Sequence, residues 1–196
     1  MSGYSAAPEQ WRLPSRGRVG MWCLIGAESA IFTIFVVAYL FYIGKSATGP
    51  QPGEVLHAPI FYSVCLLASS VTIHVAVRRI AANEMAAFGR WWTATILLGG
   101  TFLFGTAREW IHLINNEGLT ISTNLFGTTY YSLVGLHAVH VTVGLVALTT
   151  VAVFYFSAWL ERAHAERLEI LSMYWHFVDA VWVVVFTLVY VIGVSR

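Results

Sequence analysis

Charged residues are scarce in this chain of 196 residues, and their scarcity decides its class. Asp, Glu, Lys and Arg make up 11% of the residues, against about 25% in ordinary soluble domains. Hydrophobic residues make up 58%, and the mean hydropathy is +0.69. This composition excludes an ordinary soluble domain and predicts an integral membrane protein.

Clustered positive charge and paired cysteines are also lacking. The net charge is +1, and no basic stripe of the kind that neutralises phosphates is present, so we expect no nucleic-acid partner. Cys23 and Cys65 form no CxxC pair and fall in separate apolar segments, where a thiol is a small packing residue. The sequence therefore gives no support for a disulfide or a cysteine metal site.

Long apolar runs are what the chain has instead. Each of five runs reaches the length of about 20 helical residues that crosses about 30 Å of hydrocarbon. The runs are continuously apolar rather than alternating, which favours helices over barrel strands. We predict an all-α fold, with a polar segment 1–18 followed by one membrane domain, 19–196. The expected helices are 19–43, 59–80, 91–113, 129–159 and 173–194.

The basic residues predict how this bundle is oriented. Lys and Arg collect on the cytoplasmic side of a membrane. The opposite side has only Lys45 and Arg196. We therefore expect a multi-pass protein of the cell inner (plasma) membrane with its N-terminus inside and its C-terminus outside. The eight residues on the inner side are Arg12, Arg16, Arg18, Arg78, Arg79, Arg90, Arg162 and Arg167.

Several ionisable side chains fall inside the predicted spans and need an explanation. A charge near the bilayer centre costs at least about 2.5–3.5 kcal/mol, so such groups usually face other helices or a water-filled path. His137 and His140 are three residues apart, as are His176 and Asp179, which places each pair on one helix face. The full set is Glu28, His74, Glu109, His137, His140, His176 and Asp179.

Three interpretations of these groups remain open. A di-iron or haem site is one, although di-iron bundles use Glu-x-x-His, and this chain has His-x-x-His and His-x-x-Asp instead. A proton or ion pathway is the second, for which Glu28 and Asp179 are the candidates. The third is structural, with interhelical hydrogen bonds that fix the register of the bundle.

Three motifs resemble subunit III of the haem–copper oxidases, the cytochrome c oxidase subunit 3 family, in its short five-helix bacterial form. They are YWHFVDAVW at 174–182, GLHAVHVTVGL at 135–145 and GMWCLIGAES at 20–29. LLASSVT at 66–72 and the pair Glu109–Trp110 add weaker support. Two departures are visible. The family commonly has Gln and an aromatic before the third-helix Glu, whereas this chain has Thr106 and Arg108, and near the start of the second helix the family often has Asn where this chain has Tyr62.

The resemblance implies an accessory subunit rather than a catalytic one. The haems and copper would belong to partner subunits, and this chain would contain no catalytic, cofactor or metal site. It would pack on subunit I, with subunit II in the same complex, and hold phospholipid in a cleft between its first two helices and the other three. It would sustain proton uptake and turnover in a proton-pumping cytochrome c oxidase.

The resemblance also assigns expected roles to residues. Glu28 would be a buried protonatable group, while His74, Glu109, His137, His140, His176 and Asp179 would make interhelical polar contacts. We regard Arg78, Arg79, Arg162 and Arg167 as candidate lipid headgroup contacts. The alternatives are a quinol oxidase subunit III, a nitric oxide reductase accessory subunit and, from a different class, a stand-alone proton-coupled channel or transporter.

Overall fold

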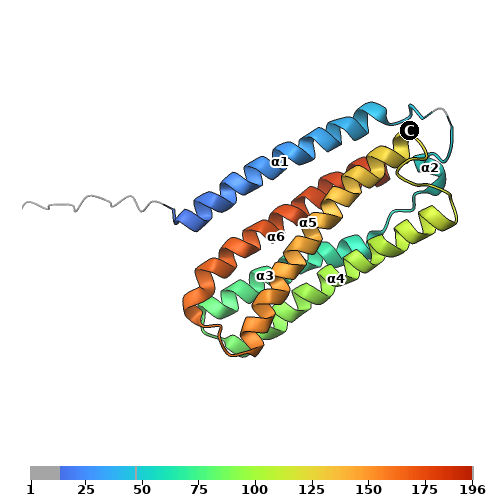
Figure 1. Ribbon diagram of the computed structural model, residues 1–196. Helices are drawn as coiled ribbons and strands as arrows, with labels where there is room; N and C mark the ends of the chain where they lie inside the picture. The colour runs from blue at the N-terminus through green and yellow to red at the C-terminus, as the bar shows by residue number, and fades with distance from the viewer. Residues whose placement is uncertain (1–13, 47, 196) are drawn as a thin grey trace, which may run out of the picture.

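The computed structural model describes residues 14–46 and 48–195, which form helices and connecting loops without a strand (Figure 1). Five helices are long, and they run alternately up and down the bundle. A short helix, a 3-10 turn and a π-helical turn complete the set. The elements are α1 (Arg16–Tyr42), α2 (Pro52–Val55), α3 (Ile60–Ala81), α4 (Met85–Asn115), α5 (Leu125–Phe156), η1 (Arg162–His164), α6 (Ala165–Phe186) and η2 (Thr187–Ile192).

Four helical segments of the described chain are long and apolar enough to cross a membrane. They are Arg16–Tyr42, Ile60–Ala81, Leu125–Phe156 and Arg162–Ile192. The 31-residue α4 runs beside them but mixes Gly, Thr and Trp with its aliphatic residues, and it does not reach the same hydropathy. The predicted all-α, multi-pass fold is therefore confirmed, whereas the count of five spans stays a prediction.

The observed helices extend beyond several predicted segments. α4 begins at Met85 rather than at 91, and α6 begins at Ala165 rather than at 173. Hydropathy marks where the hydrocarbon ends, and a helix can continue past that point when no proline or glycine stops it. Of the predicted polar segment 1–18, residues 1–13, including Arg12, lie outside the described residues, and Arg16 and Arg18 already belong to α1.

The first two long helices do not form a pair on one side of a cleft, so the expected cleft between them and the other three helices is wrong. α1 packs mainly against α5 and α6, whereas α3 packs mainly against α4 and α6, so α1 and α3 lie on opposite sides of the bundle (Figure 1). The connection between α3 and α4 has only three residues, 82–84, and such short loops join antiparallel neighbours. The connection from α1 to α3 is long enough to cross the end of the bundle.

Aromatic side chains from several helices fill the core. Trp92, Trp175 and Trp182 are all at most 1% exposed. Gly99 of α4 and Gly144 of α5 make room for Trp175, because a Cβ atom at either glycine would lie within 3 Å of its ring. These two glycines therefore receive an indole ring, whereas in many membrane proteins small residues bring two backbones together.

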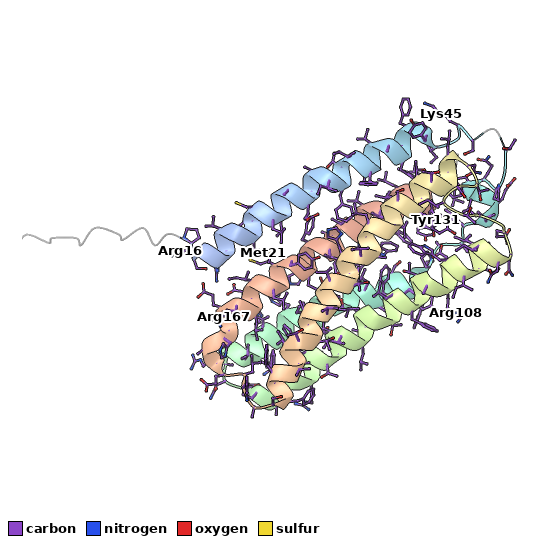
Figure 2. All side chains as sticks on the ribbon, in the orientation of Figure 1. Arg16, Met21, Lys45, Arg108, Tyr131 and Arg167 are labelled. Carbon is purple, nitrogen blue, oxygen red and sulfur yellow. The ribbon has the colours of Figure 1, made fainter. Side chains whose placement is uncertain are left out.

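The alternating direction of the helices gathers the described arginines of the predicted inner side at one end. Figure 2 shows Arg16 and Arg167 toward that end, and Lys45 and Arg108 toward the other. Two ion pairs lie among the basic residues of the first end: Arg18 with Glu169 and Arg79 with Glu84, each with a nitrogen–oxygen distance of 2.7 Å. The direction in which this end faces stays a prediction.

Candidate functional site

Glu28 of α1 meets His140 of α5 within the bundle. The Glu28 Oε2 atom lies 2.9 Å from His140 Nε2, and both side chains are largely buried, with exposed fractions of 22% and 12%. The ring of Phe32, one turn along α1, lies 4.9 Å from the His140 ring between centroids. Two residues that were singled out separately in the sequence thus form one contact between helices.

The second nitrogen of His140 limits where protons can lie in this pair. His140 Nδ1 is 2.7 Å from the Leu136 carbonyl oxygen, which is an acceptor, so Nδ1 carries a hydrogen. The contact with Glu28 then needs one proton between Oε2 and Nε2. This proton belongs either to a neutral glutamic acid or to an imidazolium, and the pair has no net charge in either form.

A small cavity of about 200 Å³ lies beside this pair, between α1 and α5. Tyr174 of α6 borders it, and its hydroxyl donates to the His140 backbone carbonyl at 3.1 Å. Glu28, His140 and the Tyr174 phenol supply the polar groups of this lining, and the other lining residues are aliphatic. The lining residues are Leu24, Glu28, Val139, His140, Val143 and Tyr174.

Ser70 of α3 joins His176 and Asp179 of α6. Its Oγ atom lies 2.6 Å from Asp179 Oδ2 and 2.9 Å from His176 Nδ1. Asp179 is only 3% exposed, and its Oδ1 atom has no hydrogen-bond partner in the described structure. The serine lies between the acid and the imidazole, whereas a hydrolase triad has the imidazole in the middle, so this arrangement does not activate a nucleophile.

Two indole groups extend the same seam between α3 and α6. Trp175 Nε1 donates to Ser69 Oγ at 2.8 Å, and Trp182 Nε1 donates to Ser63 Oγ at 3.1 Å. Ser63, near the start of α3, thus meets Trp182 near the end of α6, and Ser69, further along α3, meets Trp175 nearer the start of α6, as in two antiparallel helices. Such contacts fix the register of two helices in lipid.

Glu109 of α4 accepts hydrogen bonds from two tyrosines near the end of the bundle that lies opposite to Arg16 and Arg167. The hydroxyl of Tyr190 donates to Glu109 Oε1 at 2.7 Å, and that of Tyr130 on α5 donates at 3.3 Å. Tyr190 lies in the π-helical turn η2, which contains an extra residue per turn and so changes the direction of the side chains that follow. This turn brings the phenol to the carboxylate.

His137 and His74 differ from the predicted interhelical hydrogen bonds. His137 is fully buried, and neither ring nitrogen has a hydrogen-bond partner in the described structure. Its ring stacks on Trp182 with 4.9 Å between centroids and meets Phe102 edge to face, so it packs as an aromatic residue. His74 is exposed, and its ring centroid lies 6.4 Å from that of His176.

Three of the four candidate lipid contacts have no ion-pair partner among the described residues. Arg79 is paired with Glu84, whereas Arg78, Arg162 and Arg167 are exposed and make no such pair. Arg167 lines a cavity of about 320 Å³ at the connection between α5 and α6. Bound lipid at these arginines stays a prediction.

The described residues contain no group of three or more His, Cys, Asp or Glu side chains placed to hold a metal ion.

The sequence did not reveal the hydrogen-bonding roles of Ser70, Tyr130 and Tyr190. All three side chains are uncharged, so the cost of a charge in lipid does not single them out. An α-helical spacing argument also cannot find Tyr190, because the π-helical turn interrupts that spacing.

Comparison with known proteins gives one consistent family. The family model for cytochrome c oxidase subunit III matches residues 17–194. Cytochrome c oxidase subunit 3 of Alkalihalophilus pseudofirmus is 31% identical over 196 residues, 98% of this chain and 95% of the relative. Quinol oxidase subunit 3 of Bacillus subtilis is 30% identical, with 98% and 96% covered. Cytochrome c oxidase subunit 3 of Synechocystis sp. is 36% identical, with 91% and 77% covered.

The helical bundle and these relatives define a multi-pass membrane subunit of an oxidoreductase complex. The chain belongs to the cytochrome c oxidase subunit III family, and the resemblance carried by its three motifs is confirmed. Subunit III is an accessory component of a haem–copper oxidase without catalytic metal centres, so partner subunits complete the enzyme.

Proposed function

We propose that this chain is subunit III of a proton-pumping cytochrome c oxidase in the plasma membrane of a bacterium. It binds subunit I directly, accompanies subunit II, and has its N-terminus inside and its C-terminus outside. The observation that carries the proposal is the family match over residues 17–194. The bacterial relatives named cytochrome c oxidase subunit 3 support the choice of electron donor and membrane.

The surface of α1 supports a role in an assembly. Only Phe32 and Tyr39 are buried among the 27 residues of this helix, and its outward positions include Ile34 and Val37. A membrane helix with so little surface covered by its own chain is available to lipid and to a neighbouring subunit.

Bound phospholipid is supported by the cavity at the connection between α5 and α6. Its lining combines apolar side chains such as Phe154 and Leu168 with Arg167 and His164. Arg167 is near the predicted cytoplasmic side, where basic groups attract anionic headgroups. An apolar wall beside a basic group suits an acyl chain next to a phosphate.

The decisive experiment is purification of the chain with its partners in mild detergent. We expect co-purification of a haem-containing subunit, and oxygen consumption with reduced cytochrome c as donor. Activity with a quinol and none with cytochrome c would identify a quinol oxidase instead, the alternative that the Bacillus subtilis quinol oxidase relative favours. A stoichiometric Soret band on the isolated chain would contradict the accessory role.

Two further outcomes separate the remaining alternatives. Reduction of nitric oxide rather than oxygen by the purified complex would identify an accessory subunit of a nitric oxide reductase. A chain that purifies without any haem protein and conducts protons in liposomes would instead be a channel or transporter. In both cases the cytochrome c oxidase proposal fails.

Replacing Glu28 with Gln is expected to leave assembly intact and to shorten the period over which the oxidase stays active. The Gln amide can donate to His140 Nε2, which keeps the contact between α1 and α5 but removes its mobile proton. The measurement is oxygen consumption followed over many turnovers. Glu84→Gln, at an exposed carboxylate, is the control and should behave as the native enzyme.

The initial rate separates the supporting role from direct participation. We expect it to change less than the lifetime of activity in Glu28→Gln. Complete loss of oxygen reduction in a normally assembled Glu28→Gln complex would contradict the supporting role and indicate that Glu28 participates directly.

A further inference from the structure

The contacts of Ser70 with two titratable side chains can do more than fix the register of α3 against α6. The hydroxyl lies between Asp179 Oδ2 and His176 Nδ1 at 2.6 and 2.9 Å. A hydroxyl can donate to one neighbour while it accepts from the other. The three groups therefore form a continuous hydrogen-bonded chain from a buried acid to a half-buried imidazole.

This chain is satisfied in two opposite directions. In one state, a neutral Asp179 donates to Ser70, and Ser70 donates to His176 Nδ1. In the other, His176 Nδ1–H donates to Ser70, and Ser70 donates to the Asp179 carboxylate. One state becomes the other when the acid proton moves to Ser70 Oγ while the serine proton moves to His176 Nδ1. No heavy atom has to leave its place.

The exposure of the side chains increases stepwise from Asp179 through His176 to His74. Asp179 is 3% exposed, His176 is intermediate and His74 is exposed. His74 lies one turn from Ser70 on α3, with 6.4 Å between the His74 and His176 ring centroids, a separation that one water molecule can bridge. Arg78 follows one turn further, at the basic end of the bundle.

Asp179 has little other contact with titratable groups. In the described structure its single hydrogen-bond partner is Ser70, and its Oδ1 atom has none. The other helices packed on α6 are α1 and α5, which contribute Glu28, His137 and His140 and, at the basic end, Arg18, whose charge is paired with Glu169. Glu28 and His140 are hydrogen-bonded to each other, and the ring nitrogens of His137 have no hydrogen-bond partner among the described residues.

We propose that Ser70 links Asp179 and His176 into a proton-exchange relay, with His74 as its opening toward the basic end of the bundle. The relay loads and unloads the proton of a buried carboxylic acid. It goes beyond the accessory role in the oxidase, because it belongs to this chain alone and needs no particular electron donor.

The test follows deuterium exchange at the Asp179 carboxylic acid by infrared spectroscopy. The full chain, with the subunits that co-purify with it, is placed in lipid nanodiscs and transferred to heavy water. The carbonyl band of the acid is assigned by its loss in Asp179→Asn and its shift in Asp179→Glu. Ser70→Ala should slow exchange of this band about tenfold or more, a barrier increase of about 1.4 kcal/mol.

Two variants act as controls. Ser70→Thr retains the hydroxyl and should exchange at the native rate. Ser29→Ala removes a hydroxyl that bonds only its own helix backbone, at Ile25, and should also leave the rate unchanged.

A further variant is the test if Ser70→Ala does not fold. His176→Gln removes the imidazole that follows Ser70 in the relay and should slow exchange in the same way.

A purely structural seam predicts a different result. Native exchange in a folded Ser70→Ala or His176→Gln protein would overturn the relay, as would the lack of any carbonyl band from Asp179 across the pH range in which the protein is folded. Failure of the cytochrome c activity test would leave these measurements unaffected, so the two proposals fail independently.

Discussion

Replacing Trp175 with Ala is expected to lower the free energy of unfolding by about 3–5 kcal/mol, the usual loss for a large buried aromatic. Trp175 has no exposed surface, and its indole fills the space left by Gly99 and Gly144. Its Nε1–H also donates to Ser69, which would lose this partner. The lipid gives no hydrophobic drive between helices, so lost packing is the main cost.

Unfolding by denaturing detergent, followed by circular dichroism, measures this loss. The control is Trp22→Ala, at a side chain of α1 that is 62% exposed, and we expect a loss below about 1 kcal/mol there. Equal losses at the two positions would show that the central packing around Trp175 does not exist as described.

A double-mutant cycle between Glu28 and His140 is expected to give a coupling energy of about 1–2 kcal/mol, the upper range for hydrogen bonds inside membranes. Each single leucine variant removes one partner and leaves the other largely buried without its hydrogen bond. The double variant removes both groups, so it should be less destabilised than the sum of the singles.

The matched control is the pair of Arg79 and Glu84. Its atoms are closer, at 2.7 Å, but the side chains are 45% and 49% exposed, and water screens them. Exposed pairs of this kind are worth about 0.2–1 kcal/mol, and we expect the low end. A coupling for Glu28 and His140 no larger than this control would contradict the buried contact.

The long helices were predictable because the membrane leaves a chain few choices. In hydrocarbon a helix satisfies every backbone hydrogen bond internally, so a long apolar run indicates a helix whatever surrounds it. Hydropathy does not locate the helix ends, and α4 and α6 accordingly begin six and eight residues before their predicted starts, at Met85 and Ala165. The short α2 and the π-helical turn η2 were not predicted at all.

The polar contacts were only half predictable. The cost of a charge in lipid singles out Glu28 and Asp179 as residues that need partners, and spacing places His176 on the same face as Asp179. Neither argument names the partner. His140 and Ser70 lie 112 and 109 residues away in sequence from these two acids, and small differences in helix rotation would select other residues.

By itself, therefore, the sequence determined the membrane class, the helical fold, the family and the residues that had to be accounted for, since these follow from local composition and motifs. Only the tertiary structure decided that α1 packs on α5 and α6, that His137 packs as an aromatic ring, and that Ser70 connects an acid to an imidazole. Those outcomes depend on which helices lie side by side and how each is rotated, and helix contacts in lipid are too weak and too numerous to be read from spacing alone.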